Sequence, residues 1–226
     1  MSKPRFAVAV NDIPQLALGD QVRVLEATGV DEWHVELSDG AFAPGPQGSV
    51  ALVRQLAAES KLPVYVHLRM WKPEHLIDAL AKAGCKGVTV PIEACAHANR
   101  TLNQVREHGI EAGVSICAAT SLTRLDYVLD LVSRVVVHAS EPARVGERFI
   151  ETSTERVRIL GENLRYRESR AVVQVVGDIS TENAARLHKF GAQVLTLGRA
   201  VFGDAPASEA AFLEFLEVLA EKRHLV

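Results

Sequence analysis

The 226-residue sequence has few cysteines and no recognisable cysteine motif. Cys85, Cys95 and Cys117 form neither a CxxC pair nor a cysteine–histidine spacing typical of zinc sites. Such an odd and sparse set predicts reduced thiols and no structural zinc ion. Hydrophobic residues make up 48% of the chain and charged residues 23%, a balance that is ordinary for a globular protein.

The sequence also lacks long apolar runs and an excess of charge of one sign. No run approaches the ~18 apolar residues that a bilayer-spanning helix needs, and no basic-then-apolar leader precedes the first strand-like segment. The formal net charge of −3 offers nothing that would recruit nucleic acid or an acidic membrane surface. We therefore expect a cytoplasmic protein without a nucleic-acid or membrane partner.

What the sequence does contain is a regular alternation of short β-branched runs and helical patterns. The strand-like runs are residues 5–10, 32–37, 64–68, 87–91, 112–116, 134–139, 171–176 and 193–198. The helical patterns are residues 18–29, 49–60, 73–84, 98–109, 122–132 and 180–191, with two more that begin near 152 and 208. Glycines stand where four helical patterns give way to strands, as left-handed C-caps require. These glycines are Gly29, Gly84, Gly109 and Gly191.

This alternation predicts a single (β/α)8 TIM barrel over residues 1–226. Strands that alternate with helices of this length pair in parallel through right-handed crossovers. Eight such units fill the 226 residues with almost no insertion. A doubly wound sheet is the alternative, but no Gly-x-Gly-x-x-Gly follows the first strand. No break in composition indicates a second domain.

The stretch WHVELSDGAF, residues 33–42, places polar side chains in an apolar strand. His34 and Glu36 project to the same face because side chains alternate along a strand. An edge strand with one wet face would explain them, but in a barrel they lie at the carboxyl-end mouth, where active sites are built. His67 and His138 occupy equivalent positions on two other strands. The histidines and Glu36 suit a divalent ion such as zinc, iron or manganese.

Two glycine-containing segments follow the last two strands. VVGDIS contains Gly177, and TLGRAVFG contains Gly198 and Arg199; each is expected to open a helix. The loops after the seventh and eighth strands of many barrels bind phosphate through backbone amides. Arg199 would add a bidentate contact to a phosphate or carboxylate. The alternative is that both glycines only make tight turns.

Longer segments resemble one known family, ribulose-phosphate 3-epimerase. LEATGVDEWHVELSDGAFAP is similar to the family's strand-two signature, in which His-x-Asp precedes an Asp-Gly turn. LPVYVHLRMWKPEHLIDALAKAG is similar to the strand-three segment that carries a second histidine. ACAHANRTLNQVREHGIEAGVSICAATSLTRLDYVL and AQVLTLGRAVFG follow in the same order and spacing. The likeness therefore runs over nearly the whole chain.

The resemblance implies a 1,1-proton transfer. In that family a divalent metal held by two histidines and two aspartates stabilises a cis-enediolate, and the aspartates serve as base and acid on opposite faces of the substrate. His34 and His67 match the histidines, and Glu36 matches the first aspartate with its carboxylate ~1.5 Å further out. Val176 stands at the position of the second aspartate. The chain therefore resembles a divergent member of the family.

Other departures lie at the same rim. The methionines that the family places over its substrate correspond to Ser38, Arg69 and His138. The family's phosphate loop Pro-Gly-Phe-Gly-Gly reads PARVG here, so that Arg144 replaces part of a backbone cradle that Gly146 completes. The predicted substrate contacts are Ser38, Arg69 and Arg144, and the predicted phosphate contacts are Gly146, Gly177, Gly198 and Arg199.

The two arginines, Arg69 and Arg144, suggest that the substrate carries a second anionic group, such as a carboxylate. Alternatively they are solvated or pair with Glu141 or Glu147 at the rim.

The sequence thus predicts an epimerase-family isomerase that acts on a small phosphorylated ketose or sugar acid through a metal-stabilised enediolate, with an altered substrate. Glu36 is the predicted base on one face, and Asp178 or His138 would supply the missing acid or a fourth metal ligand. One weakly held divalent ion and a homodimer or higher homo-oligomer are expected. The alternatives are a metal-assisted lyase or decarboxylase on a phosphorylated sugar acid and a non-catalytic sugar-phosphate-binding protein.

Overall fold

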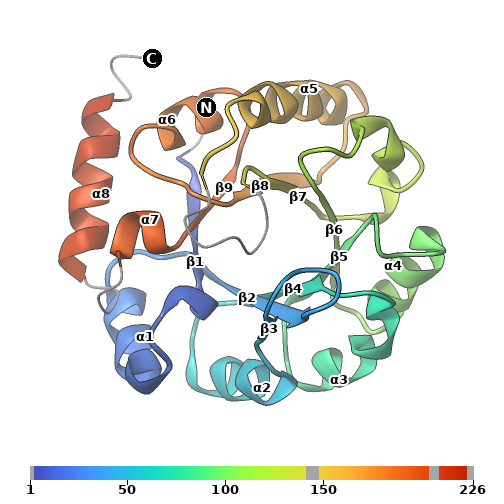
Figure 1. The fold of residues 1–226 in the computed structure, drawn as a ribbon, viewed down its shortest axis with the longest axis horizontal. Helices are drawn as coiled ribbons and strands as arrows, with labels where there is room; N and C mark the ends of the chain where they lie inside the picture. Colours follow the sequence, from blue (N-terminus) through green and yellow to red (C-terminus); the bar gives the residue numbers. More distant parts are fainter. Residues whose placement is uncertain (1–2, 141–147, 204–208, 223–226) are drawn as a thin grey trace.

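The computed structural model describes residues 3–140, 148–203 and 209–222, and within them eight parallel strands close into a barrel (Figure 1). The barrel strands are β1 (Arg5–Ala9), β2 (Glu32–Asp39), β4 (Val64–Arg69), β5 (Gly87–Pro91), β6 (Glu111–Ile116), β7 (Arg134–His138), β8 (Val172–Val176) and β9 (Val194–Leu197). Each strand pairs with the next, and β1 pairs with both β9 and β2. This closure confirms the predicted TIM barrel and excludes an open doubly wound sheet.

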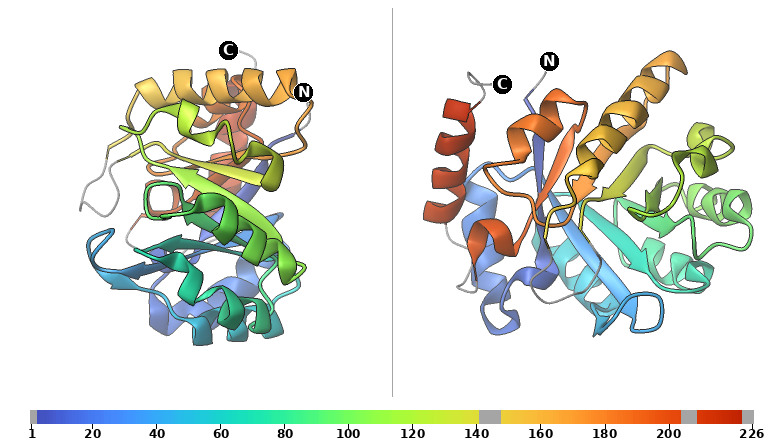
Figure 2. Two further views of the ribbon diagram at one scale, coloured as in Figure 1. Left: turned by 90° about the vertical axis from the view of Figure 1, so that its right-hand side faces the viewer. Right: turned by 45° about the horizontal axis from the view of Figure 1, so that its top comes forward.

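Helices surround the strands on the outside, as both the view along the barrel and the turned views show (Figures 1 and 2). They are α1 (Leu18–Ala27), α2 (Val50–Glu59), α3 (Ile77–Lys82), α4 (Ala98–Glu107), α5 (Thr152–Tyr166), α6 (Ala184–Lys189), α7 (Arg199–Phe202) and α8 (Glu209–Lys222). None of the helices that the structure describes is both long and apolar enough to cross a membrane.

The apolar core lies between the barrel and this helical layer. Both faces of the strands are covered, so β5 and β7 are buried along their whole lengths. Phe6 on β1 makes edge-to-face contacts with Phe212 and Phe215 of α8. These contacts fix the last helix against the first strand and complete the outer layer.

Polar side chains fill the interior of the barrel beneath its carboxyl-end mouth. The Arg134 guanidinium pairs with both carboxylate oxygens of Glu32, one at 3.0 Å, and its Nη1 donates to Gln174 Oε1 at 2.7 Å. The same guanidinium lies 3.7 Å from the ring centroid of Tyr65. Glu32, Arg134 and Gln174 are almost completely buried. This network, which was not predicted, anchors the floor beneath the mouth.

The prediction of a helix at residues 122–132 is wrong. Two 3₁₀ turns, η4 (Leu122–Leu125) and η5 (Leu129–Leu131), occupy this segment instead. Leu125, Val128 and Leu129 are buried nonetheless. Apolar residues spaced three and four apart identify the buried side of a segment, and a 3₁₀ turn presents that side as well as an α-helix does.

The other helices and strands begin and end close to the predicted residues, and four short elements were not predicted. These are η1 (Val10–Asp12), η2 (Gln15–Ala17), the antiparallel strand β3 (Pro46–Gln47) and η3 (Pro73–His75), which separates Pro73 from α3. The four predicted C-cap glycines have positive φ angles between 72° and 118°. No disulfide joins Cys85, Cys95 and Cys117, in agreement with the expected reduced thiols.

Candidate active site at the barrel mouth

A pocket of about 540 Å³ opens at the carboxyl ends of the barrel strands. Residues from β1, β2, β4, β7, β8 and β9 line it. The predicted site residues on its wall are His34, Glu36, Arg69, His138, Val176, Gly177, Asp178, Gly198 and Arg199. The fold thus brings most of the predicted residues together, although they are distant in sequence.

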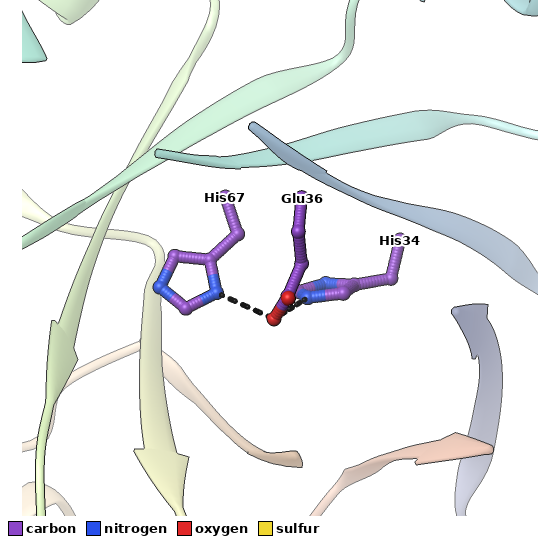
Figure 3. A group of neighbouring side chains, drawn as sticks. All are labelled: His34, Glu36 and His67. Atoms are coloured by element: carbon purple, nitrogen blue, oxygen red, sulfur yellow. Dashed lines mark ion pairs between the residues drawn. The ribbon is translucent and has the colours of Figure 1, made fainter. Parts of the chain in front are cut away.

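Glu36 lies at the centre of the polar groups in this pocket. Its Oε1 is 3.6 Å from both His34 Nε2 and His67 Nδ1, and the two rings face the carboxylate from β2 and β4 (Figure 3). Its Oε2 lies 2.5 Å from Arg69 Nη1. Burial would raise the pKa of the Glu36 carboxyl, but the two imidazoles and the Arg69 charge outweigh it and hold that pKa well below its usual range.

The strand register explains this arrangement. Glu36 on β2 is the pairing partner of His67 on β4, and Arg69 follows two residues later on the same face. Asn11, directly after β1, fixes the Glu36 backbone from the other side. Its Nδ2 donates to the Glu36 carbonyl at 3.0 Å, and its Oδ1 accepts from the Glu36 amide at 2.7 Å. The sequence reading did not identify Asn11, although it stands where a polar residue follows a buried strand.

The residues fit a divalent ion. His34, Glu36 and His67 each offer one ligand atom, and these atoms lie within 4.8 Å of one another. His34 Nε2 and His67 Nδ1 are buried and have no hydrogen-bond partner among the residues that the structure describes. Burial lowers the pKa of His67 to about 4, although Glu36 opposes this effect, so its imidazole is neutral at pH 7. Neutral imidazole nitrogens and a carboxylate suit zinc, iron or manganese.

His138 and Asp178 stand apart from this group of three. The His138 ring centroid is 5.1 Å from that of His67, and burial holds the pKa of His138 well below its usual range. Asp178 has a left-handed φ of 48°, and its Oδ2 accepts the Phe149 amide at 2.9 Å. Both residues line the pocket, but neither joins the cluster of ligand atoms.

The part of the pocket that follows β8 and β9 contains the predicted anion-binding glycines. Gly198 is the N-cap residue of α7, whereas Gly177 lies in a turn well before α6 and does not open a helix as expected. A Cβ on Gly177 would lie 2.2 Å from Ser140 Oγ, and one on Gly198 would lie 2.1 Å from Asp12 Oδ2. The backbone therefore approaches its neighbours too closely for any side chain at either position.

Asp12, which the sequence reading missed, lies beside this part of the pocket. Its Oδ2 accepts the Arg199 amide at 3.1 Å, and burial raises the pKa of its carboxyl. Asp12 and Glu36 are thus two acidic groups of one pocket, and the Glu36 charge adds to the rise in the Asp12 pKa. The signal in the sequence is the Asn-Asp pair that directly follows the first strand.

Three other predicted residues require separate comment. Ser38 does not line the pocket; its hydroxyl donates to the Ala43 carbonyl at 3.0 Å and accepts from the Gly40 amide at 3.3 Å. It therefore holds the turn after β2. Arg144 and Gly146 lie outside the residues that the structure describes.

The family model described as the ribulose-phosphate 3 epimerase family matches residues 7–202. The chain belongs to the ribulose-phosphate 3-epimerase family. The match spans all eight strand–helix units up to α7, including every residue of the pocket described above. The family match therefore covers both the barrel strands and the residues that line the pocket.

Named epimerases are similar to this family member over most of its length. The chloroplastic ribulose-5-phosphate-3-epimerase of Arabidopsis thaliana is 33% identical over 85% of this chain and 69% of its own length. The ribulose-phosphate 3-epimerases of Aquifex aeolicus and Bacillus subtilis are 30% and 29% identical, and the matches cover 84% and 90% of those proteins. These relatives support an epimerase-family enzyme.

More distant solved structures share the fold of this epimerase-family chain. A mutant tryptophan synthase alpha-subunit from Pyrococcus furiosus matches 98% of the chain and 100% of its own length with a TM-score of 0.70 at 17% identity. Phosphoribosyl anthranilate isomerase from Thermococcus kodakaraensis matches 96% and 99% with a TM-score of 0.62 at 12% identity. At such low identity the similarity concerns the barrel alone.

Proposed function

We propose that this chain is an isomerase that moves a proton at the carbon beside the carbonyl of a small phosphorylated ketose or sugar acid, with a substrate different from that of its named relatives. The observation that carries the proposal is the environment of Glu36. A carboxylate with a strongly lowered pKa faces the pocket and is ionised at neutral pH. It is therefore present in the deprotonated form that a general base requires.

The cationic and imidazole groups around Glu36 would stabilise the charge that develops on the substrate oxygen. Arg69 is 7% exposed, and its Nε and Nη2 have no hydrogen-bond partner among the described residues. These two donors remain available for an enediolate or carboxylate oxygen. A divalent ion held by His34, Glu36 and His67 would supply further polarisation of the carbonyl when it is bound.

The β8 side of the pocket differs from the expectation for an ordinary epimerase. Val176 lies there, 4% exposed, and it cannot carry a proton. An inverting enzyme needs an acid in addition to its base, and Asp178 and Asp12 are the carboxyl groups of the pocket that are separate from Glu36. Each uses one oxygen to accept a backbone amide and has a second oxygen for a substrate.

The phosphate of the substrate would lie against Gly177, Gly198 and Arg199. Both glycines line the pocket directly after β8 and β9, where the phosphate loops of this fold lie. The Asp12 carboxylate accepts the Arg199 amide and reduces the positive potential there. A phosphate monoester would therefore rely more on Gly177 and on the Arg199 side chain.

A lyase or decarboxylase acting on a phosphorylated sugar acid is the second candidate. Val176 leaves a single-sided arrangement of Glu36 and Arg69, and such a reaction needs only enediolate stabilisation and one proton donor. The buried Arg69 guanidinium favours this alternative because it suits a substrate carboxylate.

Solvent-deuterium exchange tests the proposal. The protein would be incubated in deuterium oxide with a panel of ketose phosphates and phosphorylated sugar acids, and the products would be analysed by NMR. Exchange with inversion supports the epimerase, and exchange without inversion indicates that Glu36 acts alone. Release of carbon dioxide or carbon–carbon cleavage supports the lyase. Binding of a panel compound without exchange or cleavage would overturn both and leave a binding protein.

Glu36→Gln provides the necessary control. The amide keeps the shape of the side chain and still accepts from Arg69, but it cannot remove a proton. We expect exchange to fall by roughly 10²–10⁴-fold. A matched variant is Glu59→Gln, which makes the same change at an exposed residue of α2 and leaves exchange unchanged.

A further inference from the structure

Gln174 is a fully buried amide on β8 that connects the floor of the barrel to His34. Its Oε1 accepts from Arg134 Nη1 at 2.7 Å. Its Nε2 lies 2.7 Å from Thr196 Oγ1 and 3.2 Å from His34 Nδ1. Gln174 therefore contacts one member of the ligand cluster directly, from the side opposite Glu36.

The orientation of this amide is fixed by Arg134. A guanidinium carries only donors, so the group that faces it must be the amide oxygen. Arg134 itself cannot turn away, because both oxygens of Glu32 hold it and the Tyr65 ring covers it. The Gln174 nitrogen must consequently face His34 and Thr196.

An amide nitrogen donates and does not accept, so His34 Nδ1 must be the acceptor in its contact with Gln174. A neutral imidazole has one proton, which is then on Nε2. This is the atom that lies 3.6 Å from Glu36 Oε1. His34 is therefore placed as a hydrogen-bond donor toward the Glu36 carboxylate.

His67 is not constrained in this way. Its Nε2 lies 2.9 Å from Ser115 Oγ, and a hydroxyl can accept the imidazole proton as well as donate one. His67 Nδ1 can thus present a lone pair toward the cluster. The two histidines therefore differ in their readiness to bind an ion, although each has a nitrogen 3.6 Å from Glu36 Oε1 and the two rings lie on either side of the carboxylate (Figure 3).

We propose that Gln174 is a positioning residue that keeps His34 in the Nε2–H tautomer and so makes this chain a weak binder of divalent ions. To ligate an ion through Nε2, His34 must move its proton to Nδ1, where it meets the amide N–H of Gln174. Turning the amide would only transfer the clash to Arg134, which also presents a donor. The inference rests on the proposed function in that it concerns the same site.

The decisive variant is Gln174→Glu. A carboxylate accepts from Arg134, from the Thr196 hydroxyl and from His34 Nδ1–H together, so it reverses the preferred tautomer. The tautomer would be read from ¹⁵N NMR of the chelator-treated protein at about pH 8, above the ordinary pKa of histidine. Zn²⁺ affinity would be measured by competition with a chromophoric chelator. We expect Nε2–H in the wild type, Nδ1–H in Gln174→Glu, and roughly 10–100-fold tighter Zn²⁺ binding.

Two matched variants separate the tautomer from charge and folding. Gln47→Glu adds the same charge at an exposed position on the pocket wall, without contact to His34, and should tighten Zn²⁺ binding less. Gln174→Leu removes the donor that opposes Nδ1–H without adding charge, so it should bind Zn²⁺ more tightly than the wild type, although Glu36 still attracts the Nε2 proton in the metal-free protein. This second variant keeps the test valid if Gln174→Glu does not fold.

The inference fails if His34 carries Nδ1–H in the wild type, if Gln174→Leu binds Zn²⁺ no more tightly than the wild type, or if Gln174→Glu binds Zn²⁺ no more tightly than Gln47→Glu. None of these measurements uses a substrate. Failure of the exchange panel would therefore overturn the proposed function alone, and an Nδ1–H proton in the wild type would overturn the tautomer alone.

Discussion

The Glu36 carboxylate contacts the buried Arg69 guanidinium and two imidazoles, and these contacts were only partly predictable. The alternation of side chains along a strand places His34 with Glu36 and His67 with Arg69, so their common face followed from the sequence. The sequence could not show that Arg69 pairs with Glu36 across the two strands. That contact depends on the register, which local patterns do not specify.

Arg69→Met should increase the affinity of the cluster for divalent ions. The guanidinium lies 2.5 Å from Glu36 Oε2 and repels any ion that approaches Oε1. Removal of the charge should tighten Zn²⁺ binding at least about tenfold, which is ~1.4 kcal/mol. It should also raise the pKa of the Glu36 carboxyl, because one of the groups that lower it is lost.

Chelator competition would measure this affinity, with Arg158→Met as the control. Arg158 is a partly exposed arginine of α5, in the outer helical layer, and it does not line the pocket. It pairs with Glu155 and Glu162. Equal affinities in the two variants would show that Arg69 does not oppose the ion.

Val176→Asp should create the acid that the family places in the seventh barrel strand. Val176 pairs with His138 across β7 and β8 and lines the pocket, so a carboxylate there would enter the pocket from β8, whereas Glu36 enters it from β2. We expect ribulose 5-phosphate epimerisation to rise from the background by roughly 10²-fold or more. An NMR assay of the two epimers measures it, and Val24→Asp, at an exposed position of α1, serves as the control. A folded Val176→Asp protein without gain would show that the missing acid is not the reason for altered chemistry.

At the scale of elements, strands were easier to predict than the segments between them. Residues 87–91 form β5 as expected because a β-branched run bounded by turns has few other conformations in a barrel. Residues 122–132 form two 3₁₀ turns because the apolar spacing specifies the buried side and leaves the hydrogen-bond pattern open. Gly177 lines the pocket directly after β8 but does not open α6 as expected, and its predicted phosphate contact stays a prediction.

Gly177→Ala tests the β8–α6 turn. Gly177 has a φ of 99°, and an added Cβ would lie 2.2 Å from Ser140 Oγ and 2.9 Å from the Ser140 amide nitrogen. We expect a loss of about 2–4 kcal/mol in the free energy of unfolding, from left-handed strain together with overlap. Gly109→Ala, at a φ of 72° with open space around it, should lose only the strain, about 1–2 kcal/mol.

Urea unfolding measures both variants, and thermal shifts with inorganic phosphate examine the anion site. Phosphate should stabilise the wild type and Gly109→Ala, and it should stabilise Gly177→Ala less. If Gly177→Ala retains the full phosphate shift, the β8–α6 turn does not hold the anion.

Across the whole molecule, the barrel shape was predictable and its polar interior was not. Eight strand–helix units determine the closure, but Glu32, Arg134 and Gln174 come from three separate strands and meet only after the barrel forms. Their sequence contexts are ordinary strand ends or strand interiors. Neither composition nor spacing shows which buried polar residues will face one another, because that depends on the stagger of the closed sheet.

Two buried neutral imidazoles in this interior make the fold sensitive to acid. Burial lowers the pKa of His67 to about 4 and holds that of His138 well below its usual value, whereas an unfolded histidine titrates near 6.5. Between about pH 6.5 and 4 the unfolded chain therefore binds more protons than the folded chain, and the free energy of unfolding rises with pH in this window. The stabilisation is complete above pH ~6.5 and is lost as the pH falls toward ~4.

Urea unfolding of the chelator-treated protein at about pH 7.5 and 5 measures this loss, which should be about 2 kcal/mol for His67, with a further loss from His138. Glu36 adds little in this range, because its lowered pKa keeps it ionised in the folded chain, and an unfolded glutamate is largely ionised at pH 5. His138→Leu should lose less stability between the two pH values than the wild type, and His75→Leu, at an exposed position, should behave as the wild type. A His138→Leu protein with the full acid sensitivity would show that His138 is already protonated in the folded barrel at pH 5.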